Sequence, residues 1–320
     1  MGQNWVRVLQ VKLKQDLGNG KGREIVFGDN FPNYDLQIEI QVNKYMSALK
    51  DNALITIANL TYSEVINIVN GKYYSVEIIA GYRNGNQMCV FKGAILRISN
   101  TLESDRTNVI SILCGSNLIA RYSQKFLNFS LKSGMNTYSA IKFLSARAGI
   151  KNGNISEQFK KDFLQQVQTE TKTIGGYLEA LTTDNASFVL NADASANSTF
   201  SIYDARRSNN RVINLADAQF IAKMPSLNSS GLNFTLMPVF NFMCGDVVLI
   251  DNAMISLSKV DSLDNLTNQP GYYLDTSNEG SSLGAYVIIN ITYTLCNRSS
   301  EFSCNITAKA RSLLSNFIGV

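Results

Sequence analysis

The sequence predicts a mainly β protein in which two antiparallel, barrel-like units are joined by a small α+β connector. Segments whose apolar residues alternate with polar ones, as in half-buried strands, recur in the first and last thirds of the chain. The period lengthens to that of a helix only in the middle third. At 320 residues, 45% of them apolar, with 16 Phe, 14 Tyr and 1 Trp, the chain has material for a sizeable folded core.

The first unit, residues 1–118, contains strand-like segments separated by turn signals. The clearest segment alternates Leu36, Ile38, Ile40 and Val42 with polar residues, which places one face against the core and the other in water. A short helix is expected at 63–69, capped by Ser63 and closed by Asn70 and Gly71. Strands are expected at 6–15, 24–27, 36–43, 53–60, 73–82, 88–99 and 108–114.

The connector, residues 119–210, combines helices with a hairpin. Asn136 or Thr137 caps a predicted helix that ends near Gly149, and a second helix is expected at about 173–181. Strands at 187–190 and 199–203 are expected to pair around the loop between them.

The second unit, residues 211–320, returns to the strand period. Val248 and Ile289 are expected to point into its core. The predicted strands lie at 231–237, 247–250, 286–293 and 302–308, with a long polar loop at 261–282.

The two β units share a local pattern. Residues 98–102 and 291–295 both read I-x-x-T-L, each after a Gly-Ala step at 93–94 or 284–285 and each before an Arg-containing turn and a final strand. Residues 76–79 and 247–250 are also similar in character. A divergent duplication of one barrel explains these matches, and chance similarity between two amphipathic hairpins is the alternative.

Composition excludes several classes of function. The absence of histidine removes Ser-His-Asp and Cys-His nucleophile sets and His-based zinc sites. The net charge is +4, without a run of five or six basic residues, so nucleic-acid binding is not predicted. Charged residues are only 17%, whereas Asn occurs 35 times, so amides and hydroxyls supply the polarity.

The sequence shows no pattern that predicts a signal peptide or a membrane-spanning helix. The first residues lack the features of a signal peptide, and the most apolar stretch, 240–250, is interrupted by Asn241, Gly245 and Asp246. Synthesis in the cytoplasm and no membrane partner are therefore expected. The five cysteines have no C-x-x-C spacing and are expected to be reduced and mostly buried: Cys89, Cys114, Cys244, Cys296 and Cys304.

Other groups of residues could form sites, but each has a simpler interpretation. The glycine loop at 18–22 lacks the G-K-[ST] and the helix of a phosphate cradle. The basic cluster at 206–211 is typical of a solvated linker, although it could meet an acidic partner. The carboxylates that could serve glycoside hydrolysis are better explained as solvated acids on helix faces and turns: Glu157, Glu170, Glu179 and Asp184. Two sets of oxygen ligands could bind calcium but lack the Gly and terminal Glu of an EF-hand loop, and a hairpin tip explains them better: Asn191, Asp193 and Asn197, or Asp261 and Asp264. The sequence therefore predicts no catalytic, cofactor-binding or metal-binding residue and no cofactor.

Three segments carry a resemblance to a known family. Residues 231–238, 244–250 and 284–308 resemble baseplate hub proteins of contractile-tailed bacteriophages, the group of the late-control tail proteins and the hub part of type VI secretion spikes. The helix at 136–149 and the helix-hairpin segment from residue 174 also look like that family's middle region. Tyr293 is a departure, because many relatives carry histidine there.

The resemblance implies a structural role in a virion tail. Such hubs have two tail-tube-like barrels per chain, and three copies form a ring that joins the hexameric tail tube to a trimeric spike. The implied partners are a homotrimer of the chain itself, a tube or tube-initiator protein, a central spike protein and other baseplate proteins. A carboxylate-dependent cell-wall-degrading tail enzyme and a tail adhesin are the alternative functions.

Overall fold

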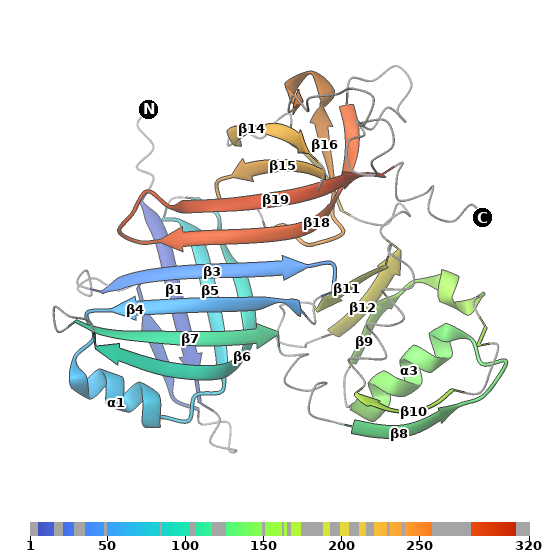
Figure 1. Ribbon diagram of the computed structural model, residues 1–320, viewed down its shortest axis with the longest axis horizontal. Helices are drawn as coiled ribbons and strands as arrows, with labels where there is room; N and C mark the ends of the chain where they lie inside the picture. The colour runs from blue at the N-terminus through green and yellow to red at the C-terminus, as the bar shows by residue number, and fades with distance from the viewer. Residues whose placement is uncertain are drawn as a thin grey trace.

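The computed structural model shows a protein built mainly of antiparallel strands (Figure 1). It describes residues 6–15, 22–28, 36–47, 50–83, 85–102, 107–116, 126–148, 151–161, 163–164, 168–173, 188–192, 199–204, 211–215, 221–228, 231–238, 241–257 and 283–311. The mainly β fold expected from the strand period is therefore confirmed.

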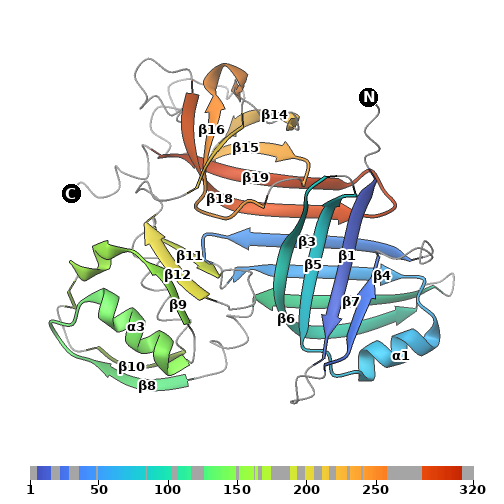
Figure 2. The same cartoon turned by 180° about the vertical axis from the view of Figure 1, so that it is seen from behind.

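Seven strands and one helix form the first β unit. Its strands follow the order β3-β4-β7-β6-β5-β1-β2, and every neighbouring pair is antiparallel. Figure 2 shows β1 and β5 crossing steeply over the layer made by β3, β4 and β7. The elements are β1 (Arg7–Lys14), β2 (Glu24–Phe27), β3 (Gln37–Tyr45), β4 (Asn52–Ala58), α1 (Tyr62–Asn70), β5 (Ser75–Tyr82), β6 (Gln87–Leu102) and β7 (Asn108–Ser116).

The second β unit has the order β14-β15-β19-β18-β16-β13, with β17 added outside β14. Its elements are β13 (Val212–Asn214), β14 (Ile221–Asn228), β15 (Gly231–Leu236), β16 (Val247–Asp251), the 3-10 turn η3 (Asn252–Met254), β17 (Ser256–Leu257), β18 (Leu283–Cys296) and β19 (Phe302–Ala310). The sequence pattern missed β13, β14 and β17, which are short or irregular in register.

The two β units have the same strand order. Reading β14, β15, β19, β18, β16 and β13 against β3, β4, β7, β6, β5 and β1 gives the same neighbours throughout. The one difference is direction, because β13 runs parallel to β16 whereas β1 runs antiparallel to β5. Shared topology of this kind supports the predicted duplication, since chance similarity of two hairpins does not extend to six strands.

Matching β-bulges align the two units residue by residue. The pairing of β6 with β7 skips Leu96, and that of β18 with β19 skips Ile289. Superposing the bulges places residues 98–102 on residues 291–295, as the I-x-x-T-L pattern predicts. The Gly-Ala steps do not correspond, because Gly93 then falls on Tyr286, two residues beyond Gly284.

Small elements between the units form the middle region. A two-stranded sheet contains β8 (Phe126–Leu131) and β10 (Gln168–Thr173), and a three-stranded sheet contains β9 (Lys151–Ile155), β11 (Phe188–Ala192) and β12 (Thr199–Asp204). The helix α3 (Thr137–Ala148) and the 3-10 turn η2 (Glu157–Lys160) lie beside β9. The antiparallel pairing of β11 with β12 and the α3 helix are as predicted.

Details of the helix predictions differ from the structure. Thr61, not Ser63, caps α1: its side chain accepts from the Glu64 N–H, and the Glu64 carboxylate accepts from the Thr61 N–H. Asn136 caps α3 by accepting from the Ser139 N–H. The helix predicted at 173–181 lies outside the described residues except for Thr173, which ends β10.

One hydrophobic core runs through both β units. Its buried members come from all the long strands, including Ile38 and Ile55 in the first unit and Val248 and Ile291 in the second. Val248 points inward as predicted, but Ile289 occupies the bulge of β18 and is half-buried. No helix in the described part of the chain has the length and apolarity needed to cross a membrane.

Candidate assembly interface

The described candidates for catalysis or metal binding do not come together in the structure. Glu157 is exposed and pairs with Lys160, 2.6 Å away. No group of three His, Cys, Asp or Glu within the described ranges could hold a metal ion. Asn191 lies in β11 and Glu170 in β10. Outside the described residues lie Gly18 to Lys21, Glu179, Asp184, Asp193, Asn197, Arg206, Arg207, Asp261 and Asp264.

Arg211, the member of the predicted basic cluster that the structure describes, forms an ion pair within the chain. Its guanidinium pairs with the buried Asp246 carboxylate, which also accepts from the Met243 N–H at 2.8 Å. This pair holds the loop that leads into β16, so the charge of Arg211 is already used inside the chain.

The five cysteines are free, and all except Cys89 are buried, which confirms that prediction. Cys296 and Cys304 do not face each other: Cys304 lies opposite Tyr293, while the Cys296 Sγ accepts from the N–H groups of Arg298 and Ser299. Burial raises the pKa of the Cys304 and Cys114 thiols to about 12, so these thiols remain protonated and unreactive.

The geometry with functional meaning is an edge-to-edge contact between the two β units. Residues 290–296 of β18 pair antiparallel with residues 39–45 of β3, so both units belong to one continuous sheet (Figure 1). We call this pairing the internal seam. Across it the Thr292 hydroxyl donates to Asn43 Oδ1 at 3.1 Å. Within the first unit, the Asn43 side chain in turn donates to Asn52 Oδ1 of β4 at 3.0 Å.

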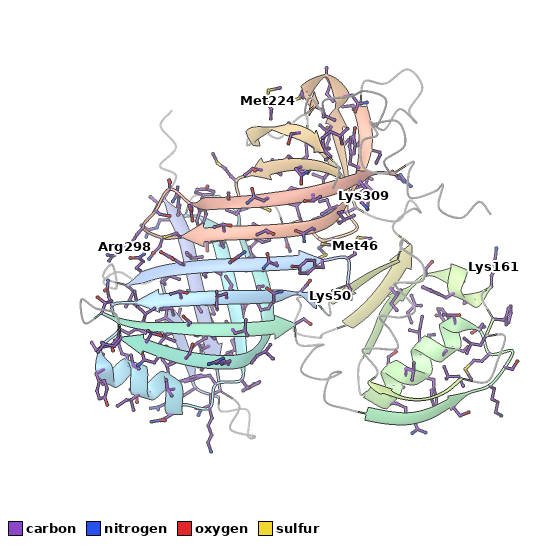
Figure 3. The ribbon with its side chains drawn as sticks, viewed as in Figure 1. Met46, Lys50, Lys161, Met224, Arg298 and Lys309 are labelled. Carbon is purple, nitrogen blue, oxygen red and sulfur yellow. The ribbon has the colours of Figure 1, made fainter. Side chains whose placement is uncertain are left out.

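The β18–β19 hairpin tip fastens the internal seam at one end. Asn297 accepts from the Ile38 N–H at 2.9 Å and donates to the Leu36 carbonyl at 3.0 Å. The Arg7 guanidinium donates to the Ser299 carbonyl at 2.5 Å and lies 5.1 Å from the centre of the Phe302 ring. Figure 3 shows Arg298 at this tip, beside the start of β3. Groups of both β units therefore satisfy one another's backbone, and the seam is a built interface.

On the first unit, the strand edge that corresponds to the seam edge of β18 belongs to β6. In the described structure, residues 97–102 of β6 pair with β7 along one edge, and no strand pairs along the other. Leu102 is 63% exposed, whereas its counterpart Leu295, which lies opposite Ile40 of β3, is 1% exposed. The same position is thus buried where a neighbouring unit is present and uncovered where none is.

Exposed apolar side chains border this open edge. The Ile95 N–H donates to the Tyr74 carbonyl at 2.8 Å, and Asn108 donates to the Leu60 carbonyl at 3.3 Å, so α1 and its flanks lie along β6. α1 buries Val65 and Ile68 in the core. The large apolar side chains exposed on α1, on β6 and between them are Tyr62, Ile66, Val69, Tyr74, Leu96 and Leu102. Where such side chains form one patch, the surface is typical of one that binds another protein.

A second candidate edge lies at the far end of the sheet. β14 is the counterpart of β3, and the two-residue β17 covers its outer edge only at Ser226 and Leu227. Met224 of β14 is 64% exposed and points away from the sheet in Figure 3. The edges that correspond to the two strands of the internal seam are therefore residues 97–102 of β6, which have no strand on one side in the described structure, and β14, which has only β17 there.

Sequence reasoning did not find the seam residues. The strand period shows which face of β3 and β18 is buried, but a strand edge consists of backbone groups that every sequence carries. The usable signal was the I-x-x-T-L repeat, which marks β6 and β18 as equivalent strands.

Comparison with known proteins gives the fold a context. No protein-family model matches the chain, and no curated protein matches it in sequence. Among solved structures, a 43 kDa tail protein of prophage MuSo2 from Shewanella oneidensis matches with a TM-score of 0.56 and 9% identity, over 96% of this chain and 98% of that one. A tail protein from Neisseria meningitidis MC58 matches with a TM-score of 0.55 and 10% identity, over 97% and 98%.

A third structure is an E. coli component of the type VI secretion system, described as similar to the T4 bacteriophage tail proteins gp27 and gp5. It matches with a TM-score of 0.50 and 10% identity, over 86% of this chain and 73% of that one. At these identities the likeness establishes the fold: the chain has the fold of phage tail and type VI secretion proteins along nearly its whole length.

Proposed function

We propose that this chain, which has the fold of phage tail proteins, is a structural hub of a tail baseplate. In this role three copies form a ring that joins a sixfold tail tube to a threefold central spike. The observation that carries the proposal is the pair of β units with the same strand order, joined by a seam. In the described structure the counterpart edge on β6 has no partner strand, and the one on β14 has only the two-residue β17.

Symmetry gives the reason for a duplicated unit. A contact between unlike edges closes into a ring when the rotation fits, and each chain contributes two similar units to that ring. Three chains then present six similar surfaces on one face, which a hexameric tube can continue, while the ring keeps threefold symmetry for a spike. The proposed boundaries of these units remain 1–118 and 211–320, with the connector at 119–210.

The surface chemistry suits this role. The sheet face that crosses the internal seam is polar through Thr and Asn, and neighbouring strands exchange side-chain hydrogen bonds, such as Thr235 to Asn305 at 2.7 Å and Thr307 to Asn233 at 2.8 Å. Contacts of this kind avoid the cost of burying unpaired charge in an interface. Function by binding, without bond chemistry, and a place in the virion tail are parts of the proposal.

Light scattering behind a size-exclusion column tests the proposal. The purified chain, alone or with its tube and spike neighbours, is expected to elute as a trimer of the 35.4 kDa protomer. A stable monomer that joins neither partner contradicts the hub, and cell-wall cleavage by the purified chain favours the enzyme alternative.

A further inference from the structure

The internal seam indicates how one copy of the chain contacts the next. Within the chain, residues 290–296 of β18 pair with residues 39–45 of β3. The counterpart of β18 is β6, and that of β3 is β14, because each occupies the same place in its six-strand order. Six strands of the sheet, β15, β19, β18, β3, β4 and β7, separate β14 from β6, so one chain does not pair them with each other in the way that β18 pairs with β3.

We propose that residues 97–102 of β6 pair antiparallel with β14 of a second copy, in the register of the internal seam, and that β17 leaves β14 when this pair forms. The inference rests on the proposed ring and names its contact. The occupant of the apolar surface along β6 is thus the second β unit of the next copy.

The register follows from the aligned ladders. Ala53 of β4 and Leu232 of β15 are counterparts through their partners on β7 and β19, and they pair with Val42 and Leu227 respectively. Leu227 therefore takes the place of Val42, and Ser226 that of Gln41. Since Tyr293 and Thr294 lie opposite Val42 and Gln41, the contact between copies places Asn100 opposite Leu227 and Thr101 opposite Ser226.

The apolar border of β6 supports the same partner. In the internal seam the side chains of Tyr293 and Leu295, which lie opposite Val42 and Ile40 of β3, are buried in the core. Pairing with β14 brings Leu102 to the stretch that contains the exposed Met224, because β14 bulges between Lys223 and Ser226. The contact therefore covers Leu102 on one copy and Met224 on the other.

β17 has the features of a short strand that protects a sheet edge from unwanted pairing. The first unit joins β5 to β6 with the short turn 83–86, whereas the second joins β16 to β18 through residues 252–282, which include β17. The described part of this insertion pairs with β14 at two positions, through the parallel strand β17. Exposed sheet edges promote unwanted pairing, and a short covering strand limits it. A two-residue strand is also easily replaced by the six residues of β6.

A disulfide between copies tests the pairing. Ser226→Cys with Thr101→Cys should oxidise to chains linked head to tail, up to three per ring, because directly opposed residues of antiparallel strands lie within disulfide range. The control is Ser226→Cys with Ser99→Cys, whose diagonal spacing is too large for an unstrained disulfide. The wild-type chain controls for its own five thiols.

The outcomes separate this inference from the proposed function. Linked trimers from the Thr101 pair, and none from the Ser99 pair, support the register. A wild-type trimer in which the Thr101 pair stays unlinked overturns the inference and leaves the hub standing. A wild-type chain that never forms a ring overturns the hub itself.

A second disulfide tests the displacement of β17. Ser226→Cys with Ser256→Cys joins residues that are partners in the parallel pair and locks β17 onto β14. The oxidised chain should remain monomeric, and reduction should restore the trimer. Ring formation by the oxidised chain at the wild-type level would show that β17 does not need to leave.

Discussion

Asp51 lies in the hairpin between β3 and β4, at the end of the internal seam opposite Asn297. Its carboxylate accepts from the Tyr45 N–H at 2.8 Å, and its carbonyl accepts from the Ser116 N–H at 3.0 Å. Burial raises the pKa of the carboxyl to about 7, against the smaller opposing effects of the Tyr45 hydrogen bond and of Lys44. Between about pH 4 and pH 7 the Asp51 carboxyl therefore keeps its proton in the folded protein, whereas the unfolded chain, with its ordinary pKa of 3.8, has released it.

This shift predicts the sign of a pH effect on stability. Because the folded pKa is raised, the contribution of Asp51 to the free energy of unfolding is fully present below about pH 4 and is lost as the pH rises through about 7. Asp51→Asn keeps an acceptor for the Tyr45 N–H but cannot ionise. We expect it to be more stable than the wild type at pH 8 by about 1–3 kcal/mol, with little difference at pH 4.

Thermal unfolding of both chains across that pH range measures the effect. The melting temperature of the wild type should fall more between pH 4 and pH 8 than that of Asp51→Asn. Parallel curves would mean that the Asp51 carboxyl has an ordinary pKa in the folded protein.

At the scale of single elements, β6 shows how one strand serves two layers. Its first half pairs with β5 and its second half with β7, and Gly93 belongs to both ladders, opposite Val76 and Ser116. A Cβ atom at Gly93 would lie 2.2 Å from the Gly115 carbonyl oxygen and close to the Phe91 ring. Glycine is therefore required here by the close approach of two backbones.

Gly93→Ala should destabilise the fold by about 1–3 kcal/mol, because a neighbouring backbone has to shift to make room for the methyl group. Gly85→Ala is the matched control: its Cβ would lie in ordinary contact with Tyr82, 3.5 Å away, in an exposed turn. Urea unfolding should distinguish the two variants. Equal midpoints would show that β6 and β7 separate more easily than the structure indicates.

At the scale of the whole molecule, two equivalent leucines of the β units differ in burial. Leu102 and Leu295 occupy equivalent places on β6 and β18, yet one is exposed and the other buried in the seam. If assembly covers Leu102 as the chain itself covers Leu295, the two positions should respond differently to the same substitution.

Leu295→Asp should prevent stable folding, because it buries an unpaired carboxylate. Leu102→Asp should change the free energy of unfolding of the isolated chain by no more than about 0.5 kcal/mol and should weaken the trimer. Circular dichroism with urea measures the first effect and light scattering the second. A Leu102→Asp chain that is folded and fully trimeric would exclude Leu102 from the contact between copies.

How much of this the sequence could predict depends on the range of the interactions involved. The β-rich fold, the α3 helix with its Asn136 cap and the inward Val248 follow from period and capping, which are local properties. The helix cap at Thr61 was assigned to Ser63 because both residues can accept from the backbone, and only the Glu64 reciprocal bond distinguishes them. The irregular strand β14 was not predicted, because a bulged strand loses the two-residue period.

The sequence by itself determined the β-rich fold and most of the buried strand faces, with Ile289 as an exception, because side-chain alternation is a local property of the residue types. Its I-x-x-T-L pattern predicted that two distant segments repeat. Only the tertiary structure decided that β3 pairs with β18, that residues 97–102 of β6 pair with a strand on one side only in the described structure, and that β14 has only the short β17 on its outer side. The physical reason is that strand pairing joins backbone N–H and C=O groups, which are the same in almost every residue. Their partners are chosen by the packing of whole units against each other.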